Sequence, residues 1–416
     1  MLTNIQKIRT FFLYLSAIAF LIPFACFGLG RALTTIPLGI AIVCALIGGD
    51  IKGAISYLKT NKFLIPMLLL PLMMYIGIFY TPQPLQENAW SIANKYNWLI
   101  FPLLLTPMLI CIFNQRNWQL TAYNFFIISA IIIALIGILS TYSNSFFQWI
   151  LNFTDYQKQG VHSSPLQSHT ETGFITALGA FFCVTLLKYH QHYLLKLLYG
   201  ALWLLNSFYI LFINTSKTGL LLYVILLVIF SLQYLIKSWK QAVIGFICLV
   251  IIASGAMLLN PYNHSRIERL YSSIVQVDKN ADETSFGQRF IMLDLAIKQF
   301  KKSPIIGSGT GTPIQGNWLD LNNPNLTTSD PHSEFLFVMT KIGIVGLVLL
   351  ILYFAMMIYD SLFIIRKGIE ANMALGVSIS FIFYAFVESI LYHNPASYEV
   401  AFFVSLLFLS NLKKRS

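Results

Sequence analysis

Charged residues are scarce in this chain. Only 10% of its 416 residues are Asp, Glu, Lys or Arg, whereas 57% are hydrophobic. A soluble globular protein carries roughly 25% charged residues, so this deficit excludes an ordinary soluble domain. Several apolar runs approach or exceed the roughly 18–20 residues that cross a bilayer core as a helix. We therefore expect an all-α, multi-pass membrane protein.

Cysteine is also sparse, and its placement excludes two classes of site. The five cysteines all lie within or at the edges of apolar runs: Cys26, Cys44, Cys111, Cys183 and Cys248. They show no metal-ligand spacing, and no disulfide framework is expected from them. Neither a metal site nor any other cofactor site is therefore predicted from these residues.

Two further features are missing. The basic N-terminus is followed by an apolar run without a small-residue cleavage site, so we expect a retained first span. The net charge of +11 comes from basic residues scattered in short loops. A nucleic-acid-binding protein gathers such residues on one soluble face, so no nucleic-acid partner is expected. Membrane lipids are the expected surroundings and partners.

The apolar runs predict about twelve membrane spans, with edges uncertain by several residues. The predicted spans are 11–29, 33–49, 63–80, 97–113, 118–140, 168–187, 194–213, 218–236, 241–259, 334–358, 371–391 and 396–411. This pattern divides the chain into nine spans in residues 1–259, a long polar loop over residues 260–333, and three spans in residues 334–416.

The distribution of Lys and Arg predicts the orientation. Fifteen lie in segments on the side of the N-terminus, and only four lie in the short loops on the other side: Arg31, Lys95, Lys158 and Lys217. Positive residues accumulate in cytoplasmic loops. We therefore expect both termini in the cytoplasm and the 260–333 loop outside the membrane.

An amphipathic helix is predicted inside the long loop. Ser285 and Gln288 have the spacing of a capping box, and Pro304 ends the helical pattern. The apolar residues follow the helical period, namely Met292, Leu293, Ala296, Ile297 and Phe300. We expect this helix to lie on the outer membrane surface or to cap the bundle. Its apolar stripe would face the bundle and place Arg289 near the mouth of any cavity.

Two residues of this region are candidates for chemistry. His332 directly precedes a span at the outer interface, where a neutral imidazole can accept a proton from a substrate hydroxyl. The alternative is an interfacial histidine that only hydrogen-bonds the backbone. Arg289 can bind a phosphate with two parallel hydrogen bonds, or it can extend its side chain to lipid headgroups.

Other candidates lie at the outer ends of spans. Lys217 sits in a short break between two apolar runs, where a cation opposes the helix dipole. An anionic partner explains it as well as a solvated loop charge does. Glu388 lies inside an apolar run, and an ionisable residue there is a candidate functional group. Glu171 and His169 are weaker accessory candidates at the start of the sixth span.

A glycine-rich segment, GSGTG at residues 307–311, is similar to a phosphate-binding loop. It neither follows a strand nor opens a clearly marked helix, as a dinucleotide-binding fingerprint does. A turn after Pro304 is therefore the simpler interpretation.

Together these segments resemble one family. A loop helix that begins near an arginine (RFIMLDLAIKQFKKSP), a later histidine motif (HSEFL) and a glycine-bearing span (KIGIVGL) are similar to the O-antigen ligase and polymerase superfamily of bacterial inner membranes. The resemblance covers the whole topology, and its specific residues fall within roughly 215–346. The family turn that usually reads S-R-x-G is SKTG here, and Ser333 follows the histidine where the family often has Asn.

The resemblance implies a metal-independent, inverting glycosyl transfer. The donor would be a polysaccharide on undecaprenyl diphosphate, and the acceptor a sugar hydroxyl of the lipid A core. Lys217 and Arg289 would stabilise the departing diphosphate, and His332 would take the acceptor proton.

Three other functions remain open. A polymerase of the same superfamily would use a second lipid-linked chain as acceptor, and a protein-glycosylating ligase would use a protein. A flippase for lipid-linked sugars would be expected to line its membrane interior with several charges. Here few ionisable residues lie deep in the spans, with Glu388 the main one.

Overall fold

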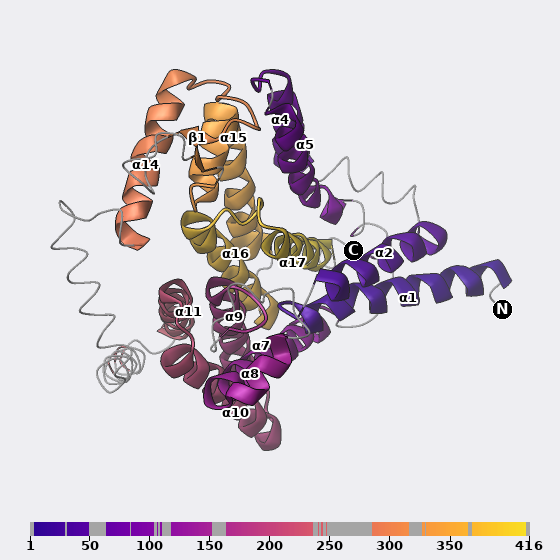
Figure 1. The fold of residues 1–416 in the computed structure, drawn as a ribbon. Coiled ribbons are helices and arrows are strands. Elements are labelled where there is room, and N and C mark those ends of the chain that lie inside the picture. The colour runs from indigo at the N-terminus through magenta and orange to yellow at the C-terminus, as the bar shows by residue number, and fades with distance from the viewer. Residues whose placement is uncertain are drawn as a thin grey trace.

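The chain folds into a helical bundle, which confirms the all-α prediction. A computed structural model describes residues 4–29, 31–49, 64–83, 85–103, 118–151, 164–235, 285–315, 327–328, 330–364 and 368–412, with a few isolated positions between them. Thirteen α-helices lie in this part of the chain (Figure 1). They are α1 (Asn4–Cys26), α2 (Arg31–Gly48), α4 (Leu64–Phe79), α5 (Gln86–Lys95), α7 (Trp118–Tyr142), α8 (Asn144–Leu151), α9 (His169–Tyr189), α10 (Tyr193–Phe208), α11 (Lys217–Leu235), α14 (Ser285–Lys302), α15 (Glu334–Tyr359), α16 (Ile369–Val387) and α17 (Asn394–Leu412).

Six stretches are long and apolar enough to cross a membrane. They are α1, α7, α9, α15 with the π-helical turn Asp360–Ile364, α16, and α10 with the π-helical turn Tyr209–Ile213. Four shorter apolar helices lie in α2, α4, α11 and α17. Together they coincide with ten of the twelve predicted spans. The spans expected at 97–113 and 241–259 fall partly or largely outside the described residues.

Helix α9 lies at the centre of the bundle and contacts α7, α10, α11 and α16. Small residues in its sequence allow these neighbours to approach closely. A close approach between backbones occurs at its N-terminal end, where a Cβ on Gly219 of α11 would lie 2.6 Å from the Cα of Gly173. Glycine at both positions therefore fixes the start of α11 against the start of α9.

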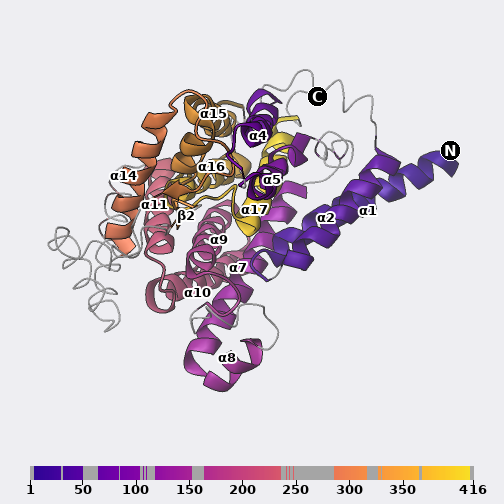
Figure 2. The same ribbon diagram turned by 45° about the horizontal axis from the view of Figure 1, so that its top comes forward.

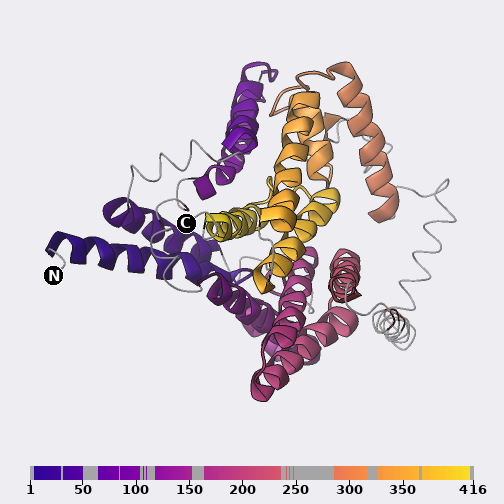
Figure 3. The same cartoon turned by 180° about the vertical axis from the view of Figure 1, so that it is seen from behind.

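The helix expected in the long loop is α14, and its bounds match the prediction. It packs along α15, while α4 lies on the other side of α15 (Figures 1 and 3). Met292 and Ala296 are buried, whereas Leu293 and Ile297 are partly exposed. The predicted apolar stripe therefore faces the bundle through Met292 and Ala296. Arg289 lies one turn before Met292 on the same side of the helix. The side chains of the expected capping box lie outside the described residues.

A short antiparallel ribbon completes the described part of the loop. Strand β1 (Ile314–Gln315) pairs with β2 (Thr327–Thr328), with Ile314 opposite Thr328. Strand β1 contacts α14, and a second view shows β2 on the side of the bundle that carries α11 and α14 (Figure 2). It brings the chain back to Asp330, directly before α15.

Helix α15 is kinked near its N-terminal end. Ile342 and Gly343 leave helical geometry, and Gly343 has a positive φ of 69°. The glycine-rich loop binds the backbone groups that the kink releases. The N–H of Gly309 donates to the Lys341 carbonyl at 3.1 Å, and the N–H of Ile344 donates to the Pro304 carbonyl at 2.8 Å. This is how irregular backbone is tolerated in a membrane helix.

The other side of the glycine-rich loop is bound to the end of α4. The N–H of Thr310 donates to the Gly77 carbonyl at 3.2 Å, and the N–H of Gly311 donates to Oγ1 of Thr81 at 3.1 Å. These amides are therefore occupied by protein acceptors rather than directed at a ligand. The segment is a turn, as the simpler interpretation held, and it joins α4 to α15.

Candidate functional site

His332 occupies a strained turn that leads into α15. Its φ is 50°, the only positive φ at a non-glycine residue in the described part of the chain. This conformation is uncommon outside glycine, although histidine adopts it more readily than most residues. Strained backbone of this kind clusters at active sites and ligand-binding sites. The backbone N–H of His332 donates to Oδ1 of Asp330 at 2.9 Å. Asp330 thus stabilises the turn that carries the imidazole.

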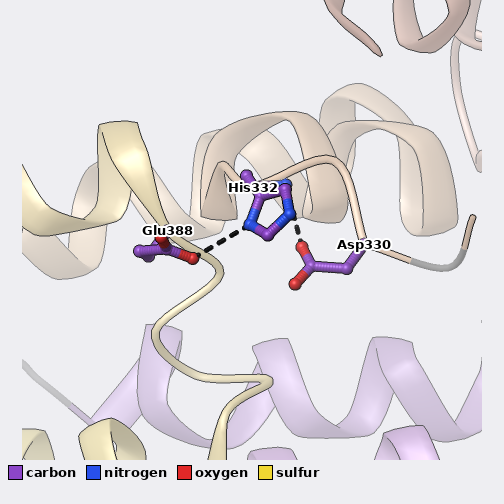
Figure 4. Close-up of side chains that lie close together, drawn as sticks. All are labelled: Asp330, His332 and Glu388. Carbon is purple, nitrogen blue, oxygen red and sulfur yellow. Dashed lines mark hydrogen bonds and ion pairs between the residues drawn. The ribbon is translucent and has the colours of Figure 1, made fainter. Parts of the chain in front are cut away.

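Glu388 joins His332 to Arg289. Helix α16 ends at Val387, and Glu388 follows it in extended geometry. Its Oε2 lies 3.1 Å from Nδ1 of His332, and its Oε1 lies 3.8 Å from Nη2 of Arg289. Figure 4 shows Asp330 and Glu388 on either side of the imidazole. Three elements distant in sequence therefore meet at one place: α14, the start of α15 and the end of α16.

The neighbours of His332 set its protonation. The hydrogen bond to Glu388 raises the pKa of His332 above its usual value, and the charges of Glu388 and Asp330 act in the same direction. Burial and the charge of Arg289 oppose them. Because Glu388 accepts a hydrogen bond, Nδ1 carries the proton, and Nε2 of the neutral ring keeps the basic lone pair.

A second imidazole lies beside this group. Nε2 of His393 is 2.6 Å from Oδ2 of Asp330, and the Ser389 hydroxyl donates to Oδ1 at 2.5 Å. Burial raises the pKa of Asp330, but hydrogen bonds from His393 and Ser389 and the charges of both histidines outweigh it and bring that pKa down to about 2. Asp330 is therefore ionised throughout the neutral range.

Glu334 attaches the first turn of α15 to its surroundings. It is fully buried, and its carboxylate accepts hydrogen bonds from the Tyr96 hydroxyl and, at 2.8 Å, from the Leu391 N–H. Tyr96 begins a 3-10 turn after α5, and Leu391 lies between α16 and α17. Glu334 thus fixes the base of the turn that holds His332.

The structure brings three of the predicted site residues together and places a fourth close enough to interact with them. Arg289, His332 and Glu388 meet directly, and Glu171 interacts electrostatically with Glu388 and His393. His169 begins α9 with an exposed side chain. The side chain of Lys217 is exposed at the start of α11, which packs on α9.

The turn before Lys217 is held by a buried polar network. Oδ1 of Asn214 accepts the Ser216 N–H at 2.6 Å, and the Ser216 hydroxyl accepts the Gly219 N–H at 2.9 Å. The network reaches Thr172 of α9, the residue directly before Gly173, which packs on Gly219. Lys217 therefore belongs to the α9–α11 contact, and α9 also carries Glu171, which faces the His332 group.

Asp330, Glu334 and His393 were not among the residues predicted for the site. Asp330 directly precedes Pro331, a pattern typical of an ordinary turn, and Ser389 and His393 lie in a mostly apolar C-terminal stretch. A signal was present in that stretch, since Glu388, Ser389 and His393 put three polar side chains within six residues at the outer end of a predicted span. An ionisable residue in such a place is a candidate for function.

Three of these residues have the chemistry of metal ligands. One ligand atom each from Asp330, His332 and Glu388 lies within 4.8 Å of the others. The surroundings fit a hydrogen-bonded network better than a divalent cation. Asp330 already binds Ser389 and His393, and the Arg289 guanidinium next to Glu388 repels a second cation.

The arrangement can carry out acid–base and anion-binding chemistry. His332 is 43% exposed and Arg289 is 40% exposed, so both can reach a ligand outside the protein. Glu388 orients the imidazole so that Nε2 is the basic atom. A guanidinium beside this base suits a reaction in which a hydroxyl loses a proton while an anion departs.

Comparison with known proteins matches part of this chain to one family. Residues 200–351 match the family model described as O-antigen ligase, a stretch that contains Lys217, Arg289 and His332 and ends before Glu388. An uncharacterized protein of Haemophilus influenzae is 27% identical over 177 residues, which cover 38% of this chain and 43% of the relative. The chain thus spans less than half the length of this relative. Residues 200–351 form a domain of the O-antigen ligase family, as the sequence resemblance predicted.

Proposed function

We propose that this protein is an O-antigen ligase. It would transfer a polysaccharide from undecaprenyl diphosphate to a sugar hydroxyl of the lipid A core, with inversion and without a metal ion. The observation that carries the proposal is the meeting of His332, Glu388 and Arg289, two of which lie within the family domain.

The reaction assigns one role to each group. The acceptor oxygen forms a bond to the anomeric carbon of the donor, while the bond from that carbon to the diphosphate oxygen breaks. Nε2 of His332 takes the proton of the acceptor hydroxyl, and the diphosphate leaves with the bonding electrons. Glu388, hydrogen-bonded to Nδ1, stabilises the imidazolium that forms. A positioned general base contributes roughly 10²–10⁴-fold to such a step.

The leaving group requires positive charge. Arg289 can bind the departing diphosphate with two parallel hydrogen bonds, because its guanidinium is planar and remains charged. Lys217 would supply a second charge across α9, where the family turn usually carries arginine. An ammonium is a point charge, so this contact lacks the paired geometry of an arginine.

The location of these residues supports the predicted orientation. The His332 group gathers the starts of α9 and α15 and the end of α16, which the positive-inside pattern assigns to one side of the membrane. We therefore place the site on the periplasmic side of a bacterial inner membrane, with both termini in the cytoplasm. Loop residues 260–333 would be the periplasmic segment between the nine spans of residues 1–259 and the three of residues 334–416.

The second candidate is a polymerase of the same superfamily, since only the acceptor differs. The test is to incubate the purified full chain with a lipid-linked donor and, in separate reactions, with lipid A–core or with a second lipid-linked chain. We expect transfer to lipid A–core. Transfer only to the second chain would favour the polymerase. Transfer to neither acceptor would favour the protein-glycosylating ligase or the flippase. A further reaction with a protein acceptor would then distinguish the protein-glycosylating ligase, which would use it, from the flippase.

A further inference from the structure

Asp330 collects three donors from two separate parts of the chain. Its Oδ1 accepts hydrogen bonds from the His332 backbone and from the Ser389 hydroxyl, and its Oδ2 is 2.6 Å from Nε2 of His393. The side chain of Asp330 is only 13% exposed. The strained backbone of His332 is thus linked through one carboxylate to the connection between α16 and α17.

This link differs from the neighbouring contact that joins the same two segments. The fully buried Glu334 already binds the Leu391 backbone and so attaches the start of α15 to the α16–α17 connection. The contact between Asp330 and His393 adds a charged pair at a place where His393 remains 43% exposed. Partly exposed ion pairs add little to stability. What sets this pair apart is its direct hydrogen bond to the backbone of His332.

We propose that Asp330 and His393 are a positioning pair that holds the His332 imidazole against Glu388. The proposal rests on the proposed function in one respect, namely that His332 is the base of the transfer reaction. Asp330 acts on the His332 backbone, and His393 acts on Asp330 by fixing the direction of its carboxylate. Neither residue needs to touch the substrate, so both are positioning residues.

The charges around His393 give the pair a pH dependence. Burial lowers the pKa of His393, but the hydrogen bond and charge of Asp330 outweigh this, and the charges of Glu388 and Glu171 also raise it. A cation of an adjacent element, Lys95 of α5, also lies close to this connection, with its ammonium 3.6 Å from the centre of the Tyr392 ring. The contact with Asp330 is strongest when His393 is protonated and weakens as the pH rises through its raised pKa.

The shorter contact of His393 with its carboxylate, 2.6 Å against 3.1 Å for His332, should keep His393 protonated to higher pH than His332. With that order of loss, transfer activity follows a bell-shaped pH profile. Activity rises with pH as His332 loses its proton and becomes a base, and it falls at higher pH as His393 loses its charge. His393→Gln should remove the fall, because an amide donates to Asp330 at every pH. His393→Ala should lower kcat roughly tenfold while leaving KM for the donor within about twofold, since it misplaces the base without touching the substrate.

A second readout does not depend on activity. In protein labelled with ¹⁵N at histidine, the titration of His332 reports its contact with Glu388. His393→Ala removes a positive charge, which by itself would raise the pKa of His332. Loss of positioning lowers that pKa instead, because the hydrogen bond to Glu388 is what raises it. The sign of the change therefore separates positioning from simple electrostatics.

The experiment compares the wild-type chain with His393→Ala, His393→Gln, Asp330→Asn, His332→Ala and the matched control His192→Ala. His192 is exposed next to α10 and should change nothing. Unchanged kcat and pH profile in His393→Ala, or a raised His332 pKa, would overturn the positioning pair. Full activity of His332→Ala would instead overturn the proposed base. If His393→Ala fails to fold, the test is the fall of transfer activity at high pH in His393→Gln and Asp330→Asn. A fall that persists in both variants would reject the positioning pair.

Discussion

Two polar segments flank the N-terminal end of α15, and their polar groups have opposite roles. In the glycine-rich loop, backbone amides and carbonyls bind α4 and the kink of α15, and a Cβ on Gly307 would lie 2.4 Å from the Lys341 carbonyl carbon. Around His332, charged side chains meet while the histidine and Arg289 remain about two-fifths exposed. In the glycine-rich loop the polar groups are hydrogen-bonded within the fold, whereas around His332 charged side chains remain available for a ligand.

This difference shows why a glycine-rich segment should not be interpreted as a phosphate site from its glycine spacing alone. A glycine-rich sequence is similar to a phosphate site because both need close approach of backbone, yet here the approaching partner is another part of the protein. The residues that remain available come from segments separated by about one hundred positions, Arg289 and Glu388. Function is indicated by converging, partly exposed charges more than by glycine spacing.

Arg289→Ala should have the largest effect on the exposed segment. Removing one pre-organised donor to a developing negative charge costs roughly 10²–10³ in kcat. Arg289→Lys should recover only part of this, because an ammonium cannot bind in two places at once. Steady-state kinetics on the purified chain would measure it, with Lys301→Ala on the same helix as the control. Comparable loss in both variants would point to damage to α14 instead.

Gly343→Ala should have the largest effect on the occupied segment. Its φ of 69° is unfavourable for alanine, and the new Cβ would lie 2.3 Å from the Ile305 carbonyl oxygen. We expect about 2 kcal/mol or more of lost stability, visible as a lower Tm in detergent. Gly39→Ala in α2 is the matched control, since a Cβ there has no neighbour within 4 Å. Equal Tm values for the two variants would contradict the account of the kink.

Glu388→Gln should shift the pH profile of transfer. Glu388 raises the pKa of His332 through their hydrogen bond, so the variant should have a lower His332 pKa. The acidic limb of kcat then moves to lower pH, and the plateau falls roughly tenfold because the imidazolium loses a charged partner. A pH–rate series from 5 to 9 would show it. An acidic limb that stays in place would mean that His332 is not the titrating base.

Asp294→Ala should have the smallest effect. Its carboxylate pairs with Lys298 one turn away at 2.5 Å, and both side chains are well exposed. Such a pair contributes about 0.5 kcal/mol or less. Thermal unfolding and kinetics should both remain near the wild-type values. A large loss of activity would place the outer face of α14 at the substrate, contrary to the present site.

The sequence predicted the parts of this structure that local pattern encodes. The bounds of α14 follow from its apolar period and Pro304, and Glu388 was singled out because a carboxylate in an apolar run is costly. His332 and Arg289 were named for their place beside the membrane. All three meet in the structure. No local sequence pattern predicts that α14 and the end of α16 both approach the turn at His332.

The rest depended on partners that the sequence does not specify. Asp330 and His393 are 63 positions apart, and neither lies in a periodic pattern. The strained turn at His332 follows from a hydrogen bond with Asp330 that could not be told from ordinary turn chemistry. Likewise, the glycine-rich loop hydrogen-bonds the kink in α15 and the end of α4. Only the packed bundle brings these two elements together.

The most direct test is the acceptor-dependent release of undecaprenyl diphosphate by purified wild-type and His332→Ala proteins, with His192→Ala as the control. The account predicts that release by the wild-type and control proteins requires lipid A–core. It also predicts that release falls by about 10² or more in His332→Ala while its Tm is unchanged. Release by His332→Ala at the wild-type rate would contradict the assignment of the base and, with it, the proposed site.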